Sequence, residues 1–240
     1  MRFFLILAAL ASMGSAPPQT PPPGAAASVQ ASPPALSEPA AAMVAGVRSA
    51  IDQELARQAE QPAPQTDADR LVNMAAVDRV GRNALARSPF QTLPEAERRP
   101  ARSAAYAYIK DQDQRAQAAM AAMQPEGGWW TRDRYGDEAA NAALLLVQHA
   151  DETAWRQYLP QLKVLAARGE APGAAVALME DRLALTDGRP QVYGTQAVCR
   201  DHRFVVYDIE DAVRAERLRS QAGMPSLASY TAEVATYPAC

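Results

Sequence analysis

The sequence predicts a mainly α-helical protein, an irregular helical bundle with one β-hairpin near the C-terminal third. Three patterns lead to this fold class. Apolar residues recur at three- and four-residue spacing along most of the chain, as they do in amphipathic helices. Residues 137–150 are apolar around nearly the whole circumference of a helix, which is typical of a central, buried element. The period changes over residues 190–208, where the β-rich runs Gln191–Cys199 and Arg203–Tyr207 are joined by a short polar turn.

The first helix is expected to begin at Ser37, Glu38 and Pro39, because a capping hydroxyl, an early acid and a first-turn Pro favour helix N-termini. Pro62 and Pro64 end this helix, since Pro disrupts the helix interior. Further helices are expected over residues 67–85, 100–123, 137–150, 152–169, 172–185, 209–221 and 226–236.

A length of 240 residues supports one sizeable core and is too short for several independent domains. We therefore expect a single helical domain over residues 40–240. Residues 17–39 are rich in Pro and Ala and have few large apolar side chains, so they predict a disordered linker.

The first 16 residues have the order of a secretory signal peptide. Arg2 is basic, Phe3–Leu10 is an apolar run, and small residues follow up to Ala16. An uncleaved anchor is the competing interpretation, but the apolar run is well short of the roughly 20 residues that a membrane span needs. We expect a secreted or periplasmic protein with no membrane span in the mature chain.

Composition excludes several classes of function. The formal net charge of -3 gives no electrostatic support to nucleic-acid binding. Two His and two Cys are too few for a Cys/His zinc finger or a disulfide-dense scaffold, so we expect no metal site. No glycine-rich phosphate loop is present in the sequence, and we expect no cofactor.

The polar residues that follow the central apolar helix are the candidates for a site. His149 ends that helix, and a buried polar side chain needs hydrogen-bond partners, so it belongs either to a structural network or to a pocket. Asp181 would orient His149, and Arg182 would bind an anionic group on a substrate. Strand periodicity would place Gln191, Tyr193 and Thr195 on one face of the hairpin, where they would be further candidates for the site.

Several short motifs in this region resemble an uncharacterised bacterial family, domain of unknown function 6624. The resemblance covers roughly residues 65–230, and Trp130 departs from the Pro that the family tends to have. It implies no activity, but it implies that the scattered polar residues form one recurring set. The matching motifs are Gly128-Trp129-Trp130-Thr131, Gln148-His149-Ala150-Asp151, Asp181-Arg182 and Gln191-x-Tyr193-Gly194-Thr195-Gln196, with Asp78 and Arg82 in matching order.

Three functions remain open at this stage. In a hydrolase-like enzyme, His149 and Asp181 would be catalytic, and water would be the nucleophile because no Gly-x-Ser-x-Gly or His-Glu-x-x-His motif occurs. In a binding module, the polar set would contact a peptide, a sugar or a small polar ligand. In a structural interaction domain, it would only lock the core. The ligand-binding candidates are Trp129, Gln148, Arg182, Gln191, Tyr193, Thr195 and Gln196.

Cys199 and Cys240 are the two cysteines of the chain. Export to an oxidising compartment favours a disulfide between them, which would attach the C-terminal tail to the hairpin. The alternative is that Cys240 is a frayed terminal residue.

Overall fold

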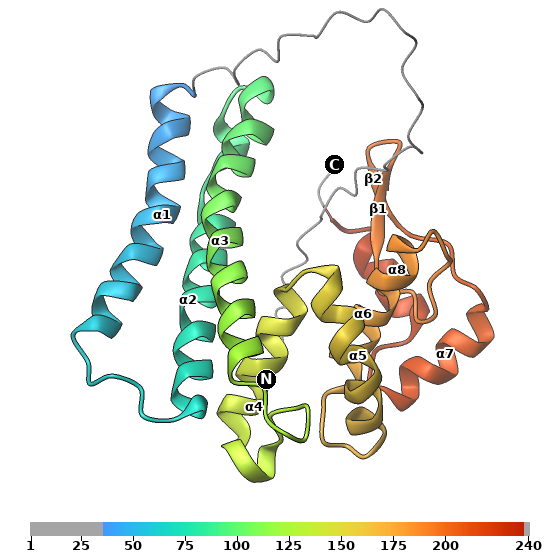
Figure 1. Ribbon diagram of the computed structural model, residues 1–240. Coiled ribbons are helices and arrows are strands. Elements are labelled where there is room, and N and C mark those ends of the chain that lie inside the picture. Colours follow the sequence, from blue (N-terminus) through green and yellow to red (C-terminus); the bar gives the residue numbers. More distant parts are fainter. Residues whose placement is uncertain (1–35, 238–240) are drawn as a thin grey trace, which may run out of the picture.

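The computed structural model describes residues 36–237 and confirms the predicted fold class of a helical bundle with one hairpin (Figure 1). Three long helices lie side by side, and the remaining helices and the hairpin form the other part of the molecule. A short 3₁₀ turn, Phe90–Thr92, precedes the third long helix. The elements are α1 (Glu38–Ala59), α2 (Asp67–Arg87), α3 (Glu95–Ala122), α4 (Arg132–His149), α5 (Glu152–Ala167), α6 (Gly173–Thr186), β1 (Ala197–Arg200), β2 (Arg203–Val206), α7 (Ala212–Gln221) and α8 (Leu227–Val234).

Side-chain caps fix where several helices begin. The Thr66 hydroxyl accepts a hydrogen bond from Asp69 N at 3.1 Å, and Asp69 accepts one from Thr66 N at 3.0 Å, which is a capping box at the start of α2. Asp151 caps α5 by accepting from Ala154 N at 3.0 Å. Residues 38 and 39, which the prediction includes in the linker, belong instead to α1, because Ser37 caps this helix and it begins at Glu38.

The third helix begins before its predicted start. Pro94 provides the entry to α3, which begins at Glu95, and Pro100 lies inside the helix rather than at its first turn. The predicted start at about Pro100 is therefore too late. The helix extends to Ala122, close to the expected end.

Two apolar clusters form the core. The first lies between α1, α2 and α3, where Ile51 packs so closely on Gly81 that a side chain there would meet Ile51 Cδ1 at 3.1 Å. The second surrounds α4, whose Leu144, Leu146 and Val147 are buried, as the composition of residues 137–150 predicts. Since α4 also packs on α2, it connects the three long helices to the rest of the domain.

The hairpin is shorter than the sequence predicts. The antiparallel register pairs Ala197 with Val206 and Arg200 with Arg203, and the turn residues Asp201 and His202 have φ of 50° and 62°. Left-handed conformation at both turn residues matches the twist of a tight hairpin.

Residues 191–196 form a loop instead of a strand. Gly194 has φ of 70°, which interrupts any strand periodicity. The prediction that Gln191, Tyr193 and Thr195 share one strand face is therefore wrong.

Within residues 36–237, none of the helices combines the length and the apolarity needed to cross a membrane. The predicted signal peptide, the linker up to residue 35, and Cys240 lie outside the described residues, so the expected export and the Cys199–Cys240 disulfide stay predictions.

Candidate functional site

His149 and Asp78 form the centre of a polar cluster between α2 and α4. The Nδ1 atom of His149 lies 2.8 Å from Oδ1 and 3.0 Å from Oδ2 of Asp78. The Asp78 side chain is 4% exposed and that of His149 is 26% exposed, so the carboxylate is covered while the ring reaches the surface. His149 is the last residue of α4, and Asp78 lies in the middle of α2.

Arg82 joins Asp78 to a second carboxylate. It lies one turn after Asp78 on α2, and its Nε donates to Asp78 Oδ1 at 2.8 Å. Its Nη2 donates to both oxygens of Asp113 on α3, each at 2.8 Å. The guanidinium carbon also lies 5.9 Å from the centroid of the Tyr106 ring. Helices α2, α3 and α4 thus contribute one charged network.

The neighbours of Nδ1 determine the tautomer of neutral His149. Arg82 Nε also lies 2.9 Å from Nδ1, but its single hydrogen is directed to Asp78 when Nδ1 is protonated. An unprotonated Nδ1 would place its lone pair against a carboxylate at 2.8 Å, which is repulsive. We therefore assign the proton to Nδ1, which donates to Asp78. Nε2 is then the acceptor nitrogen, and it makes no hydrogen bond within residues 36–237.

Burial and the neighbouring opposite charges shift the pKa values of Asp78, Asp113 and Arg82 in opposite directions. Burial raises the pKa of Asp78, but the hydrogen bond from His149 and the charges of His149 and Arg82 outweigh it, so its pKa is below the ordinary value. Burial dominates at Asp113 and raises its pKa despite the charge of Arg82. Burial lowers the pKa of Arg82, yet the charges of Asp78 and Asp113 raise it overall. The cluster therefore favours an ionised Asp78 beside His149.

Arg182 lies on α6, and its side chain contacts the C-terminal end of α4. Its Nη1 donates to Gln148 O at 3.1 Å, and Trp155 Nε1 donates to Val147 O at 2.8 Å. The Arg182 guanidinium carbon lies 5.7 Å from the Trp155 ring centroid. Burial lowers the pKa of Arg182, and the charge of nearby Arg82 lowers it further. No carboxylate of the described chain forms an ion pair with Arg182.

Asp181 binds a loop and not His149. Its Oδ1 accepts from Val192 N at 2.7 Å and Tyr193 N at 2.9 Å. Its Oδ2 accepts from Thr195 N and from the Thr195 hydroxyl, both at 2.8 Å. Asp181 is completely buried. The prediction that Asp181 orients His149 is corrected: the orienting carboxylate is Asp78, and Asp181 anchors residues 191–196.

Gln191 and Gln196 complete the same loop. The buried Gln191 amide donates to Gln196 O and to Tyr207 O, each at 3.1 Å, and its oxygen accepts from Gln196 N at 2.6 Å. The Gln196 amide donates to the Thr195 hydroxyl at 3.0 Å. Apart from the bond to Tyr207, these contacts lie within the loop, so they explain the Gln-x-Tyr-Gly-Thr-Gln motif as a folded unit.

Helices α7 and α8 hold the loop from its other side. Arg219 Nη1 donates to Tyr193 O at 3.0 Å and Gly194 O at 3.2 Å, and the Tyr230 hydroxyl donates to Thr195 O at 2.6 Å. Burial raises the pKa of Tyr193 to about 12, with a smaller contribution from the negative charge of Glu180.

Of the remaining candidates from the sequence, Trp129 lies in the core and Gln148 lies next to His149. Trp129 is buried, with its ring centroid 5.7 Å from Trp130 and 5.6 Å from Tyr158, so it packs in the core instead of lining a binding surface. Gln148 is partly exposed beside His149, and its side chain makes no hydrogen bond to any described residue.

Sequence reasoning assigned no site role to Asp78, Arg82 or Asp113. Asp78 and Arg82 stand four residues apart on α2, the spacing of an ion pair on one helix face, and this was the available signal.

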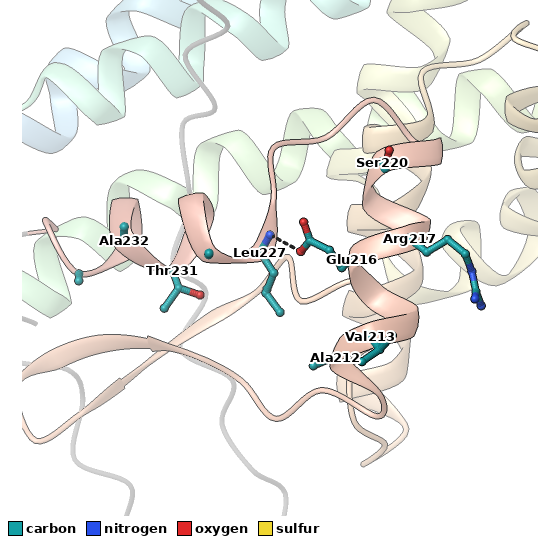
Figure 2. Close-up of a pocket in the computed structure, with 10 residues that line it drawn as sticks. Ala212, Val213, Glu216, Arg217, Ser220, Leu227, Thr231 and Ala232 are labelled. Atoms are coloured by element: carbon teal, nitrogen blue, oxygen red, sulfur yellow. Dashed lines mark hydrogen bonds between the residues drawn. The ribbon is translucent and has the colours of Figure 1, made fainter.

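An open groove between α7 and α8 is separate from this cluster (Figure 2). Glu216 accepts a hydrogen bond from Leu227 N at 2.8 Å across it. Its remaining lining is mostly small or aliphatic, including Ala212, Val213 and Ala232. None of these residues belongs to the His149 cluster. Among residues 36–237, no three His, Cys, Asp or Glu side chains are grouped in a way that could hold a metal ion.

Residues 64–236 match the family of unknown function DUF6624. The chain belongs to this family. The match contains the whole His149 cluster and the loop at 191–196, but it excludes α1. Comparison with curated proteins and with solved structures finds no significant match to either.

Proposed function

We propose that this DUF6624 domain is a hydrolase-like enzyme in which His149 is the general base and water is the nucleophile. One observation carries the proposal: Asp78 holds Nδ1 of His149, while Nε2 of the partly exposed ring has no partner among the described residues. A carboxylate that fixes the tautomer and orientation of an imidazole is the arrangement that makes His an effective base.

The proposed chemistry needs only these two groups and water. Nε2 accepts a proton from a water molecule as its oxygen attacks an electrophilic centre of the substrate. The imidazolium that forms is stabilised by the ionised Asp78, whose pKa is below the ordinary value because His149 and Arg82 outweigh the effect of burial. Nε2 then donates the proton to the leaving group. Arg82 and Asp113 would hold Asp78 in place.

A substrate panel of esters, amides and phosphodiesters tests this proposal with the full-length protein. His149→Gln should abolish hydrolysis, because Gln offers no base. His202→Gln is the matched control, since His202 is the other histidine of the chain and lies in the exposed hairpin turn. Equal hydrolysis by wild type and His149→Gln would contradict the proposal.

A non-catalytic module that binds a peptide, a sugar or another small polar ligand is the second candidate. It is favoured by the partly exposed Gln148 side chain, whose amide has no hydrogen-bond partner within the described chain and lies next to His149 in sequence. Ligand binding without turnover of any compound in the panel would favour this candidate. For either function, we propose a secreted or periplasmic location on the basis of residues 1–16.

A further inference from the structure

Arg182 has an unused hydrogen-bonding edge. Arginine presents five N–H donors in a rigid, planar fork. Nη1 of Arg182 donates to Gln148 O at 3.1 Å, and the face of the group stacks near Trp155. The edge formed by Nε and Nη2 makes no hydrogen bond to any residue between 36 and 237.

We infer that the Nε and Nη2 edge of Arg182 binds a monoanionic oxyanion group of the ligand, a carboxylate or a phosphodiester. Two parallel N–H groups match two oxygens of such a group in a bidentate pair. That this ligand is a substrate rests on the proposed function. In that case, the bound anion would position the substrate beside His149.

Charge balance favours one negative charge on the ligand. Arg82 is already paired with both Asp78 and Asp113, so it needs no further anion. Arg182, whose charge interacts with that of Arg82, has no acidic partner among the described residues. A single added anion would match this charge, whereas a dianion would also face the two carboxylates.

The environment of Arg182 also favours an anionic ligand. Burial and the charge of Arg82 both lower its pKa, which means that the cation is destabilised in the unliganded protein. A bound anion would oppose both effects. Because Arg182 binds the carbonyl of Gln148, the residue before His149, the anion and the base would be close in the ligand complex.

Calorimetric titration of the full-length protein with acetate and with dimethyl phosphate at low ionic strength tests the inference. We expect saturable binding of at least one probe, and the tighter probe identifies the source of the oxyanion. Arg182→Gln should weaken binding about tenfold or more, and Arg182→Lys should also weaken it because it keeps the charge and loses the fork. Arg217→Gln is the matched control, since Arg217 is exposed and has no ion pair within the described residues.

A second measurement covers the case in which Arg182→Gln does not fold. In the wild-type protein, the Nε–H resonance of Arg182 should shift on titration with the tighter probe. An unshifted resonance, or equal affinity in Arg182→Gln and Arg217→Gln, would overturn the inference. Binding without hydrolysis contradicts the proposed enzyme alone, whereas hydrolysis that is independent of Arg182 contradicts this inference alone.

Discussion

Asp78 contacts the base of the proposed reaction and the arginine that supports it. Its pKa is below the ordinary value of 3.8, because His149 and Arg82 outweigh burial. A carboxyl whose pKa is lower in the folded than in the unfolded state stabilises the fold above the unfolded pKa. That stabilisation is lost as the pH falls through the folded pKa.

We predict that Asp78→Asn lowers the free energy of unfolding at pH 7 by roughly 1–3 kcal/mol, because charged partners lose an ionised acceptor. The difference from wild type should shrink as the pH falls below 3.8. Urea denaturation at pH 7 and pH ~3 measures both effects. Asp52→Asn is the control, because Asp52 is 60% exposed on α1 and should change stability little. An equal loss at both pH values for Asp78→Asn would contradict the account.

At the scale of elements, residues 191–196 and α6 form one unit through Asp181. All four hydrogen bonds at the Asp181 carboxylate come from this loop. We predict that Asp181→Asn destabilises the protein by on the order of 2–3 kcal/mol, because the new amide N–H groups face donors. Chemical denaturation measures the loss of stability, and the tautomer of His149 should stay unchanged. A changed tautomer of His149 without a loss of stability would instead indicate that Asp181 is the partner of His149.

The loop also depends on a left-handed Gly194. An added Cβ would meet Ile209 Cδ1 at 2.7 Å and Leu227 Cδ1 at 3.0 Å, whereas at Gly188, also with φ of 70°, it would meet nothing within 4 Å. In both Ala variants, backbone strain should lower the free energy of unfolding by roughly 1–2 kcal/mol. We predict a larger loss in thermal stability for Gly194→Ala because it also clashes. Equal melting temperatures for the two variants would count against this packing.

The elements of this domain differ in how far sequence predicts them. Helix positions follow from local signals such as the Thr66 cap and the apolar composition of α4, which act within a few residues. The shape of the loop at 191–196 cannot be predicted from local signals, because it depends on Asp181 and on Arg219, which are distant in the sequence. His149 was identifiable as a buried polar residue, but its partner Asp78 is 71 positions away, and only folding brings them together.

For the whole molecule, α1 belongs to the domain although it lies outside the matched family region. Ile51 is 3% exposed and packs against α2 and α3, whereas Leu55, one turn later, is 38% exposed. We predict that Ile51→Ala lowers the free energy of unfolding by about 2–5 kcal/mol, because it leaves a cavity in the core. Leu55→Ala should cost much less in the same urea titration. Equal small losses would mean that α1 is not part of the cooperative fold.

Asp78 holds the proton on Nδ1 of His149, and this leaves Nε2 as the base of the proposed reaction. Two-bond ¹H–¹⁵N NMR correlation on full-length protein, at a pH where both imidazoles are neutral, measures the tautomer directly. His202, the only other histidine in the sequence, is the internal reference. We expect a protonated Nδ1 and an unprotonated Nε2 for His149 in the wild type, and loss of this preference in Asp78→Asn. A proton on Nε2 of wild-type His149, with Nδ1 unprotonated, would contradict this assignment.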